Sequence, residues 1–280
     1  NLDLCLPTFL QFFFRIPVIA NDITTASLGT TNRQYLNPQE LLDQVRLHLP
    51  PLSEQRRIVA RIEELASKIE EARGLRREAV EEADTLLVAM AHRTDLDEKI
   101  KRKEEWELVS LGDVIRQVVD AHPVNLEASY PNLGIYSFGR GLFKKPAIEG
   151  LSTSAKTLYR VRSGQFIYSR LFAFEGSYSM VSDEFDGYFV SSEYPTFECD
   201  PDRVRAEFLY AYFKSPSVWE KVATGSKGLG DRRQRVQPNQ ALAHQVLLPP
   251  MDWQNRISRV LSNRDLLKRL QTETAAELDA

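Results

Sequence analysis

Apolar residues recur along residues 53–92 at alternating intervals of four and three positions, with one interruption at Arg76. This spacing places them on one stripe of an α-helix, and the positions between them are mostly charged. A helix that continues to about His92 would be roughly 60 Å long. The stripe consists of Ile58, Ile62, Leu65, Ile69, Ala72, Ala79, Ala83, Leu86 and Met90. Because so long an apolar stripe needs a covering partner, the sequence predicts a coiled-coil helix.

A second, shorter stripe begins near the end of the chain, after Asp252. It is less regular and predicts a second helix that continues toward the end of the chain. Pairing between the two helices would leave neither stripe exposed. The residues expected to pair are Ile58, Ile62, Leu65, Ile69, Leu86 and Met90 of the first helix, and Ile257, Leu261, Leu267 and Leu270 of the second.

Both helices open on the same motif, Leu-Pro-Pro followed by a glutamine and an isoleucine, at residues 49–58 and 248–257. At the same displacement, the aromatic segment 9–17 matches residues 208–216. Two matching blocks in one register indicate an internal duplication. Proline is excluded from a helix interior, and Ser53 and Asp252 are good N-cap residues, so each motif predicts the start of a helix.

The segment between the helices has a different pattern. A charged hinge over residues 99–105 leads into Trp106, after which short aromatic and β-branched runs alternate with glycines. Residues 166–170 and 188–190 are typical of strands, and residues 204–213 and 216–222 of helices. The sequence therefore predicts an α+β fold, with a mixed α/β domain joined to long helices.

Composition narrows the function. Cys5 and Cys199 form no metal-binding pair, the four histidines are scattered, and no apolar run is long enough to span a membrane. These features predict a cytoplasmic protein without a metal site or a membrane role. A net charge of −3 weakens the case for nucleic-acid binding unless the cations are clustered.

The two Pro-Pro helix openings, the Trp-x-x-Val-x-Leu-Gly-Asp-Val segment at 106–114 and the duplication together resemble the specificity subunit of a Type I restriction-modification system. In that family, two target recognition domains alternate with two long antiparallel helices. The resemblance implies four parts. Residues 1–48 would be the C-terminal remnant of a first recognition domain, 49–102 the central helix and hinge, 103–247 a second recognition domain, and 248–280 the distal helix.

The resemblance also implies function. Such a subunit is not an enzyme: it reads a bipartite site in double-stranded DNA, its helices space the two half-sites, and it brings methyltransferase (M) and nuclease-translocase (R) subunits to the site. This chain would bind no cofactor, and S-adenosylmethionine, ATP and Mg would belong to the partners. The absence of Asn-Pro-Pro-Phe and of a phosphate-binding loop agrees with this division. A truncated subunit could also self-associate through its helices.

Clustered cations in the central domain are the candidate DNA contacts, because phosphates need accessible charge and base edges need forked side chains. We expect Arg232 and Arg233 to contact phosphates, and Arg140 and Arg170 to contact bases. The full set of candidates is Arg140, Lys144, Lys145, Lys156, Arg160, Arg162, Arg170, Lys227, Arg232, Arg233 and Arg235.

Two other functions remain open at this point. A truncated subunit could act as a scaffold or competitor that binds the methyltransferase without useful DNA recognition. A stand-alone nuclease or methyltransferase would need an acidic metal cluster or a cofactor motif, and Asp183, Glu184 and Asp186 are the nearest acidic candidates. Their close spacing is more typical of a turn.

Overall fold

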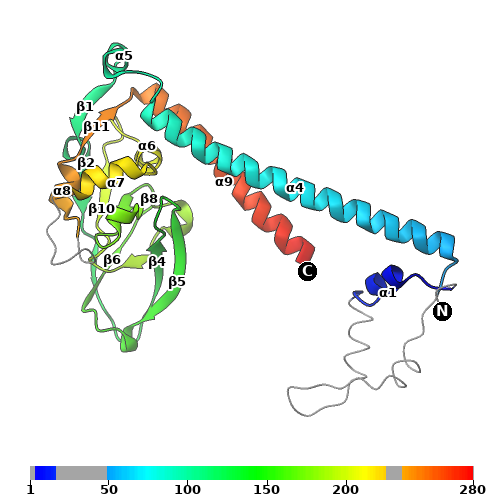
Figure 1. Ribbon diagram of the computed structural model, residues 1–280. Helices are drawn as coiled ribbons and strands as arrows, with labels where there is room; N and C mark the ends of the chain where they lie inside the picture. The colour runs from blue at the N-terminus through cyan, green and yellow to red at the C-terminus, as the bar shows by residue number, and fades with distance from the viewer. Residues whose placement is uncertain (1–3, 17–48, 225–234, 280) are drawn as a thin grey trace. The chain divides into compact units, whose positions relative to one another are not determined.

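The computed structural model describes residues 4–16, 49–224 and 235–279, and the side chains of these residues up to 273. The chain divides into two compact units, Asn1–Arg77 and Glu78–Ala280. The long helix α4 (Leu52–His92) contributes residues to both units (Figure 1). Each unit is described by itself.

In the first unit, one buried glutamine joins the short helix α1 (Pro7–Phe13) to the start of α4. Gln55 Oε1 accepts a hydrogen bond of 2.8 Å from the backbone N–H of Leu6. Its Nε2 donates to the carbonyl oxygens of Leu4, at 2.9 Å, and Pro50, at 2.8 Å. We call this set of three hydrogen bonds a glutamine clasp.

The second unit contains the same clasp at the start of helix α9 (Met251–Asp279). Gln254 accepts a hydrogen bond of 2.8 Å from the N–H of Arg205, and donates to the carbonyls of Arg203, at 2.9 Å, and Pro249, at 2.8 Å. Every partner lies at the position that the sequence repeat predicts from the first clasp. The predicted duplication is therefore present in the hydrogen bonding as well as in the sequence.

Both long helices begin one residue earlier than their predicted caps. Pro51 accepts the first helical hydrogen bonds of α4 from the N–H groups of Glu54 and Gln55. Pro250 has the same role in α9. The prediction that Ser53 and Asp252 are N-caps is wrong, because both residues lie inside the first turn. Proline can precede a helix in this way because its missing N–H would have no partner there.

Eleven described strands in the second unit form three sheets. Their orders are β1-β11, β2-β10-β7-β8 and β3-β6-β9-β4-β5, and neighbours are antiparallel except β4 and β9. The strands are β1 (Glu107–Ser110), β2 (Ile115–Val118), β3 (Ala121–Pro123), β4 (Ser129–Ile135), β5 (Leu142–Glu149), β6 (Thr157–Arg160), β7 (Phe166–Tyr168), β8 (Tyr178–Met180), β9 (Phe189–Val190), β10 (Thr196–Cys199) and β11 (Gln245–Leu248). The mixed helix and sheet composition predicted from the sequence is confirmed.

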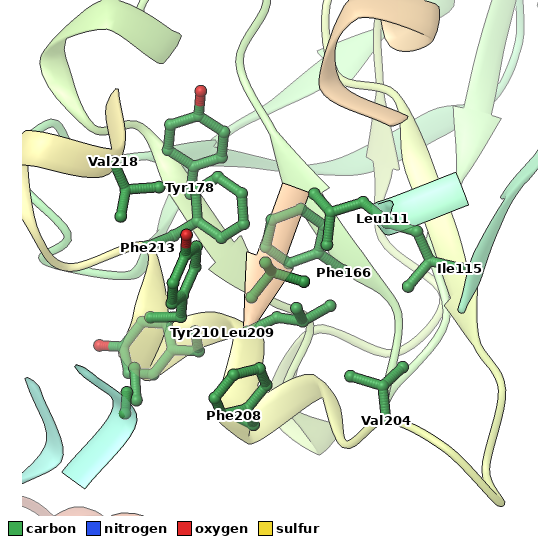
Figure 2. Close-up of a cluster of buried hydrophobic side chains, with 14 of the residues drawn as sticks. Leu111, Ile115, Phe166, Tyr178, Val204, Phe208, Leu209, Tyr210, Phe213 and Val218 are labelled. Carbon is green, nitrogen blue, oxygen red and sulfur yellow. The ribbon is translucent and has the colours of Figure 1, made fainter. Parts of the chain in front are cut away.

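Short helices complete this unit, and the helix formed by Ala206–Tyr212 contacts β7 and β8 of the four-stranded sheet. The α-helices are α5 (Glu98–Lys103), α6 (Ala206–Tyr212), α7 (Pro216–Ala223) and α8 (Pro238–Leu242), and the 3-10 turns are η1 (Leu111–Asp113), η2 (Gly150–Ser152), η3 (Ala173–Glu175) and η4 (Asp183–Phe185). Helix α6 supplies Phe208, Leu209 and Tyr210 to an aromatic core that also contains Phe166 and Tyr178 (Figure 2). Near-continuous burial of α6 explains why every residue of this helix except Glu207 is apolar or aromatic.

The C-terminal part of α4 packs against α9 in the second unit. Trp253 Nε1 donates to the carbonyl of Met90 at 2.9 Å, and Arg264 Nη2 donates to Asp84 Oδ2 at 3.2 Å. Because rising numbers in α9 meet falling numbers in α4, the two segments run antiparallel. Leu87, with Ile257 of α9, lies in the same apolar core. These contacts involve residues 84–90 of α4 and residues 253–264 of α9.

The buried side of α4 in this unit differs by one position from the predicted stripe. Leu86 is 47% exposed, whereas Leu87 is fully buried. The remaining predicted pairing residues divide by exposure. Two of them are buried, namely Ile257 and Leu261. Five are half-buried, namely Ile58, Ile62, Ile69, Met90 and Leu267. The other two, Leu65 and Leu270, are exposed.

A charged cluster lies where α4, α6 and α9 meet. Asp84 of α4 lies 3.1 Å from Arg264 Nε and 3.3 Å from Lys214 Nζ. The side chains of Arg264 and Lys214 are only 6% and 10% exposed. Although burial disfavours the charged carboxylate, Lys214 and Arg264 hold the pKa of Asp84 below its usual value. The carboxylate thus compensates two buried cations.

Two histidines for which the sequence predicted no chemical role contact Tyr212 of α6. His92 Nε2 lies 3.0 Å from the carbonyl oxygen of Tyr212, and the two rings stack. The Tyr212 hydroxyl lies 3.0 Å from His244 Nε2. Burial lowers the pKa of His244 to about 4, so this imidazole is neutral at pH 7 and serves packing and hydrogen bonding.

Candidate nucleic-acid interface

The turn between β4 and β5, residues 136–141, presents aromatic rings and an arginine to solvent. The Arg140 guanidinium lies 5.0 Å from the Tyr136 ring centre and 5.9 Å from that of Phe138. Its Nε donates to the Ser137 carbonyl at 3.0 Å. Cation–π attraction and this hydrogen bond hold the side chain while leaving it exposed.

The same surface continues along β5. Tyr136 stacks on Phe143 with ring centres 4.2 Å apart. Gly134 of β4 lies under Phe143 and Lys145, and a Cβ there would come within 2.4 Å of the Phe143 ring. Glycine is therefore required for this close approach. The contacts bring Arg140 and Lys145 onto one aromatic and basic surface.

Lys144 and Lys145 have different surroundings although they are adjacent. Successive strand residues point to opposite faces. Lys144 Nζ forms an ion pair of 2.6 Å with Glu184, which raises the pKa of Lys144. Within the described ranges, Lys145 and Lys156 are exposed and have no carboxylate partner. The charges of Lys145 and Lys156 are therefore more available to a polyanion than the charge of Lys144.

Arg160 and Arg162 are occupied by carboxylates. Arg160 Nε donates to Asp120 at 2.9 Å, and Arg162 Nη1 lies 3.6 Å from Asp186. The hydrogen bond from Arg160 lowers the pKa of Asp120, which therefore remains ionised at pH 7. These pairs reduce the charge that the two arginines can offer to phosphate, so they are weaker candidates than the sequence suggested.

Arg170 lies two residues after β7, beside the segment that enters α8. Its Nη2 donates to Gln237 Oε1 at 2.8 Å. Arg235, two residues before Gln237, forms an ion pair of 3.3 Å with the Glu193 carboxylate. The backbone carbonyl of Glu193 accepts a hydrogen bond from the backbone N–H of Arg170. The structure thus brings Arg170 and Arg235 together. The remaining candidates Lys227, Arg232 and Arg233 lie outside the described residues.

An open groove of about 1430 Å³ separates η4 and neighbouring strands from α9 within the second unit. Arg140 and Arg162 line it, as do Lys268 and Arg269 of α9. It also contains carboxylates, namely Asp183, Glu184, Glu198, Glu207 and Asp265. Because these would repel phosphate, we favour the β4–β5 turn over the groove as the DNA-facing surface.

The acidic residues Asp183, Glu184 and Asp186 lie at the 3-10 turn η4, as their spacing predicted. Asp183 accepts a hydrogen bond from Ser163, and Asp186 accepts one from the Ser163 N–H. Over residues 4–16, 49–224 and 235–279, no group of three or more potential ligands could hold a metal ion. Nor is any helix in these ranges long and apolar enough to cross a membrane.

Tyr136, Phe138 and Gln237 are additional candidates that the sequence did not indicate. The available signal for the first two was the segment Tyr-Ser-Phe-Gly-Arg-Gly at 136–141, in which aromatic residues stand beside an arginine flanked by glycines. Gln237 lies two residues after Arg235 of the basic segment, but only the fold places its amide against Arg170.

A mixed sheet domain that leads from one long helix into another through a repeated junction has the fold of Type I restriction-modification specificity subunits. The chain resembles these subunits in sequence and in structure, and the resemblance predicted from the helix openings is confirmed. The proteins that match this chain come from more than one bacterial species. The specificity subunit of the HindI Type I restriction enzyme from Haemophilus influenzae is 22% identical over an alignment of 181 residues that covers 62% of this chain.

Solved structures match nearly the whole chain. The HsdS subunit of Thermoanaerobacter tengcongensis gives a TM-score of 0.55 at 22% identity, over 99% of this chain and 68% of that one. A chain from a structure on assembly and conformational transition of the Type I system gives 0.56 at 22% identity, over 100% and 69%. The Type I S subunit from M. genitalium gives 0.53 at 13% identity, over 100% and 72%.

The match to the HindI subunit spans only 38% of that protein's length. No family model matches the chain.

Proposed function

We propose that this chain is a non-catalytic subunit that recognises double-stranded DNA for a Type I restriction-modification complex. The observation that carries the proposal is the likeness in fold over 99% or more of the chain. The exposed aromatic and basic surface around Arg140 and Lys145 is a suitable DNA-facing site. The chain would direct M and R subunits, which would hold S-adenosylmethionine, ATP and Mg.

The target is found by mapping methylated adenines in the genome of a host with and without this gene. Duplexes that carry the mapped site then serve as probes for the chain assembled with its methyltransferase. Salt-dependent binding to the site, tighter than to a scrambled duplex, supports the proposal. Binding to the methyltransferase without selective DNA binding would favour the scaffold or competitor instead.

Lys145→Gln should weaken binding to specific and scrambled duplexes by similar factors, because a phosphate contact carries no sequence information. The slope of log affinity against log salt should fall by about 1. Lys144→Gln is the matched control, since Glu184 already pairs with this lysine on the same strand. Binding isotherms at several salt concentrations measure both slopes, and equal slopes for the two variants would remove Lys145 from the interface.

We further propose that α4 and α9 pair as an antiparallel coiled coil and set the distance between two half-sites. The antiparallel contacts from Asp84 to Met90 support the pairing. A 41-residue helix would span about 60 Å, long enough to separate two DNA-binding domains. In a subunit with two complete recognition domains, a longer α4 would then recognise half-sites that lie farther apart.

Inserting four residues after Ala72 should lengthen α4 by about 6 Å, nearly two base-pair steps. The insertion adds slightly more than one turn and largely preserves the apolar stripe. Two inserted residues would turn the stripe outward and should reduce the yield of active complex. The measurement is the spacer of methylated sites in the complete subunit. An unchanged spacer with efficient methylation would show that these helices do not set the distance.

A further inference from the structure

Phe138 combines two features that are unfavourable for an ordinary surface residue. Its side chain is 62% exposed, and its backbone φ is +64°, in the left-handed region that bulky side chains avoid. Glycine would remove both costs at once. A strained backbone and an exposed aromatic ring at one residue indicate a function for the ring outside the folded chain.

The strained conformation is held from several sides. The Phe138 N–H donates to the Glu175 carbonyl at 2.7 Å, and the Gly139 N–H donates to the Gly176 carbonyl at 3.0 Å. Lys214 Nζ donates to the Gly139 carbonyl at 2.8 Å. Because Lys214 also pairs with Asp84, the turn is attached to the charged cluster between the helices.

The Phe138 ring lies beside the ring of Trp219, although the residue is largely exposed. The ring centre lies 6.2 Å from that of Trp219, which is buried. Trp219 in turn lies against Gly176, where a Cβ would be 2.3 Å from the indole. The arrangement presents a preoriented ring rather than a mobile one, which lowers the entropy lost on binding.

We propose that Phe138 is a wedge that inserts between two base pairs of the bound DNA, with Arg140 contacting the backbone or a base edge beside it. The proposal rests on the function proposed above. A flat ring can stack on any base, and the adjacent guanidinium suits a polyanion. Within the described residues, Arg140 forms no ion pair, so its charge is available.

Other exposed apolar residues lack this setting. Leu151, at 80% exposure, lies in η2 beyond the opposite end of β5. It has an ordinary backbone conformation and follows Glu149 and Gly150. Leu151→Ala therefore provides a control that removes an exposed apolar side chain from the same hairpin region without touching the turn.

The test uses the mapped target and the chain assembled with its methyltransferase. Duplexes carry 2-aminopurine, whose fluorescence rises on unstacking, at successive positions outside the methylated adenines. The wild-type complex should raise the fluorescence at one step, and Phe138→Ala should abolish that rise. Affinity for the intact duplex should fall about 5- to 150-fold, as expected for the loss of one aromatic stacking contact. The salt slope should not change, and Leu151→Ala should behave as wild type.

An abasic site at the responsive step separates a wedge from a structural residue. Because the stack is already interrupted there, wild type and Phe138→Ala should differ much less on this DNA than on the intact duplex. Phe138→Gly removes the ring and the backbone strain together. It should weaken binding like the alanine variant while leaving the melting temperature of the free protein equal or higher.

The outcomes separate this inference from the function on which it rests. If the wild-type complex does not bind the mapped site selectively, the proposed function fails. If it binds, but no step responds or Phe138→Ala binds equally well, the wedge is overturned and the function stands. A loss of affinity for the methyltransferase rather than for DNA would also overturn it, by assigning the turn to a protein contact.

Discussion

Asp84→Ala should lower the free energy of unfolding by about 3 kcal/mol at neutral pH, since it leaves the buried cations Arg264 and Lys214 without their shared carboxylate. Asp84 itself is 32% exposed, which places the effect at the lower end for a broken buried pair. Asp95→Ala is the control, because its pair with Arg93 is at the surface and should contribute less than about 1 kcal/mol.

The pH dependence gives a second measurement of the same cluster. The pKa of Asp84 is lower in the folded protein than its ordinary value of 3.8, so its contribution is present above that pH. This contribution is lost as the pH falls through the folded pKa. Denaturant titrations of wild type and Asp84→Ala should therefore converge on acidification. A constant difference between the two proteins from neutral to strongly acidic pH would contradict the ionic account.

Gln254→Ala should destabilise the second unit by about 3 kcal/mol, because one backbone N–H and two carbonyls lose their partner in a buried site. Gln254→Glu should not restore stability, since a carboxylate cannot donate to the carbonyls of Arg203 and Pro249. Unfolding monitored by intrinsic tryptophan fluorescence, to which Trp253 next to the clasp contributes, reports the change.

Gln55→Ala is the matched variant in the other copy of the clasp. It removes hydrogen bonds of the same lengths to within 0.1 Å from a side chain that is equally buried. We expect a similar local cost, detected as faster hydrogen exchange at Leu6, whose N–H is bonded to Gln55. Gln240→Ala, which removes one short bond to Val222, should cost less. If the Gln254 and Gln240 variants are equally stable, the clasp is not a main attachment of α9.

The duplicated Pro-Pro motif predicted both helix starts to within two residues, because proline restricts the chain locally. It did not predict the clasp. Gln55 and Gln254 are visible at equivalent positions, but their partners at Leu6 and Arg205 are 49 residues away along the chain in each copy. Only the folded backbone brings these groups together.

The one-position offset on α4 has a physical cause. In the second unit, the buried side follows Val80, Asp84, Leu87 and Ala91, and so includes a carboxylate. A pattern of apolar residues therefore favours the neighbouring positions 79, 83, 86 and 90, which are all apolar. Asp84 belongs to the buried side because Arg264 and Lys214 neutralise it, and this pairing depends on tertiary contacts.

The candidate interface could be predicted from the sequence only in part, because it too depends on tertiary contacts. Sequence clustering identified Arg140 and Lys145, which the fold places on one surface, but it also included Arg160 and Arg162 among the candidates. Their pairing with Asp120 and Asp186 depends on contacts across loops and strands. Phe138 was missed because its significance lies in a backbone angle, and residue type alone does not reveal that angle.

The glutamine clasp also bears on how such proteins could diversify. All of its partners are main-chain groups, so one copy accepts leucines at positions 4 and 6 and the other accepts arginines at 203 and 205. The glutamine clasp therefore does not depend on the side chains of the module that it attaches. A globular module with a different surface can therefore precede the same Leu-Pro-Pro segment and long helix, with the attachment geometry preserved.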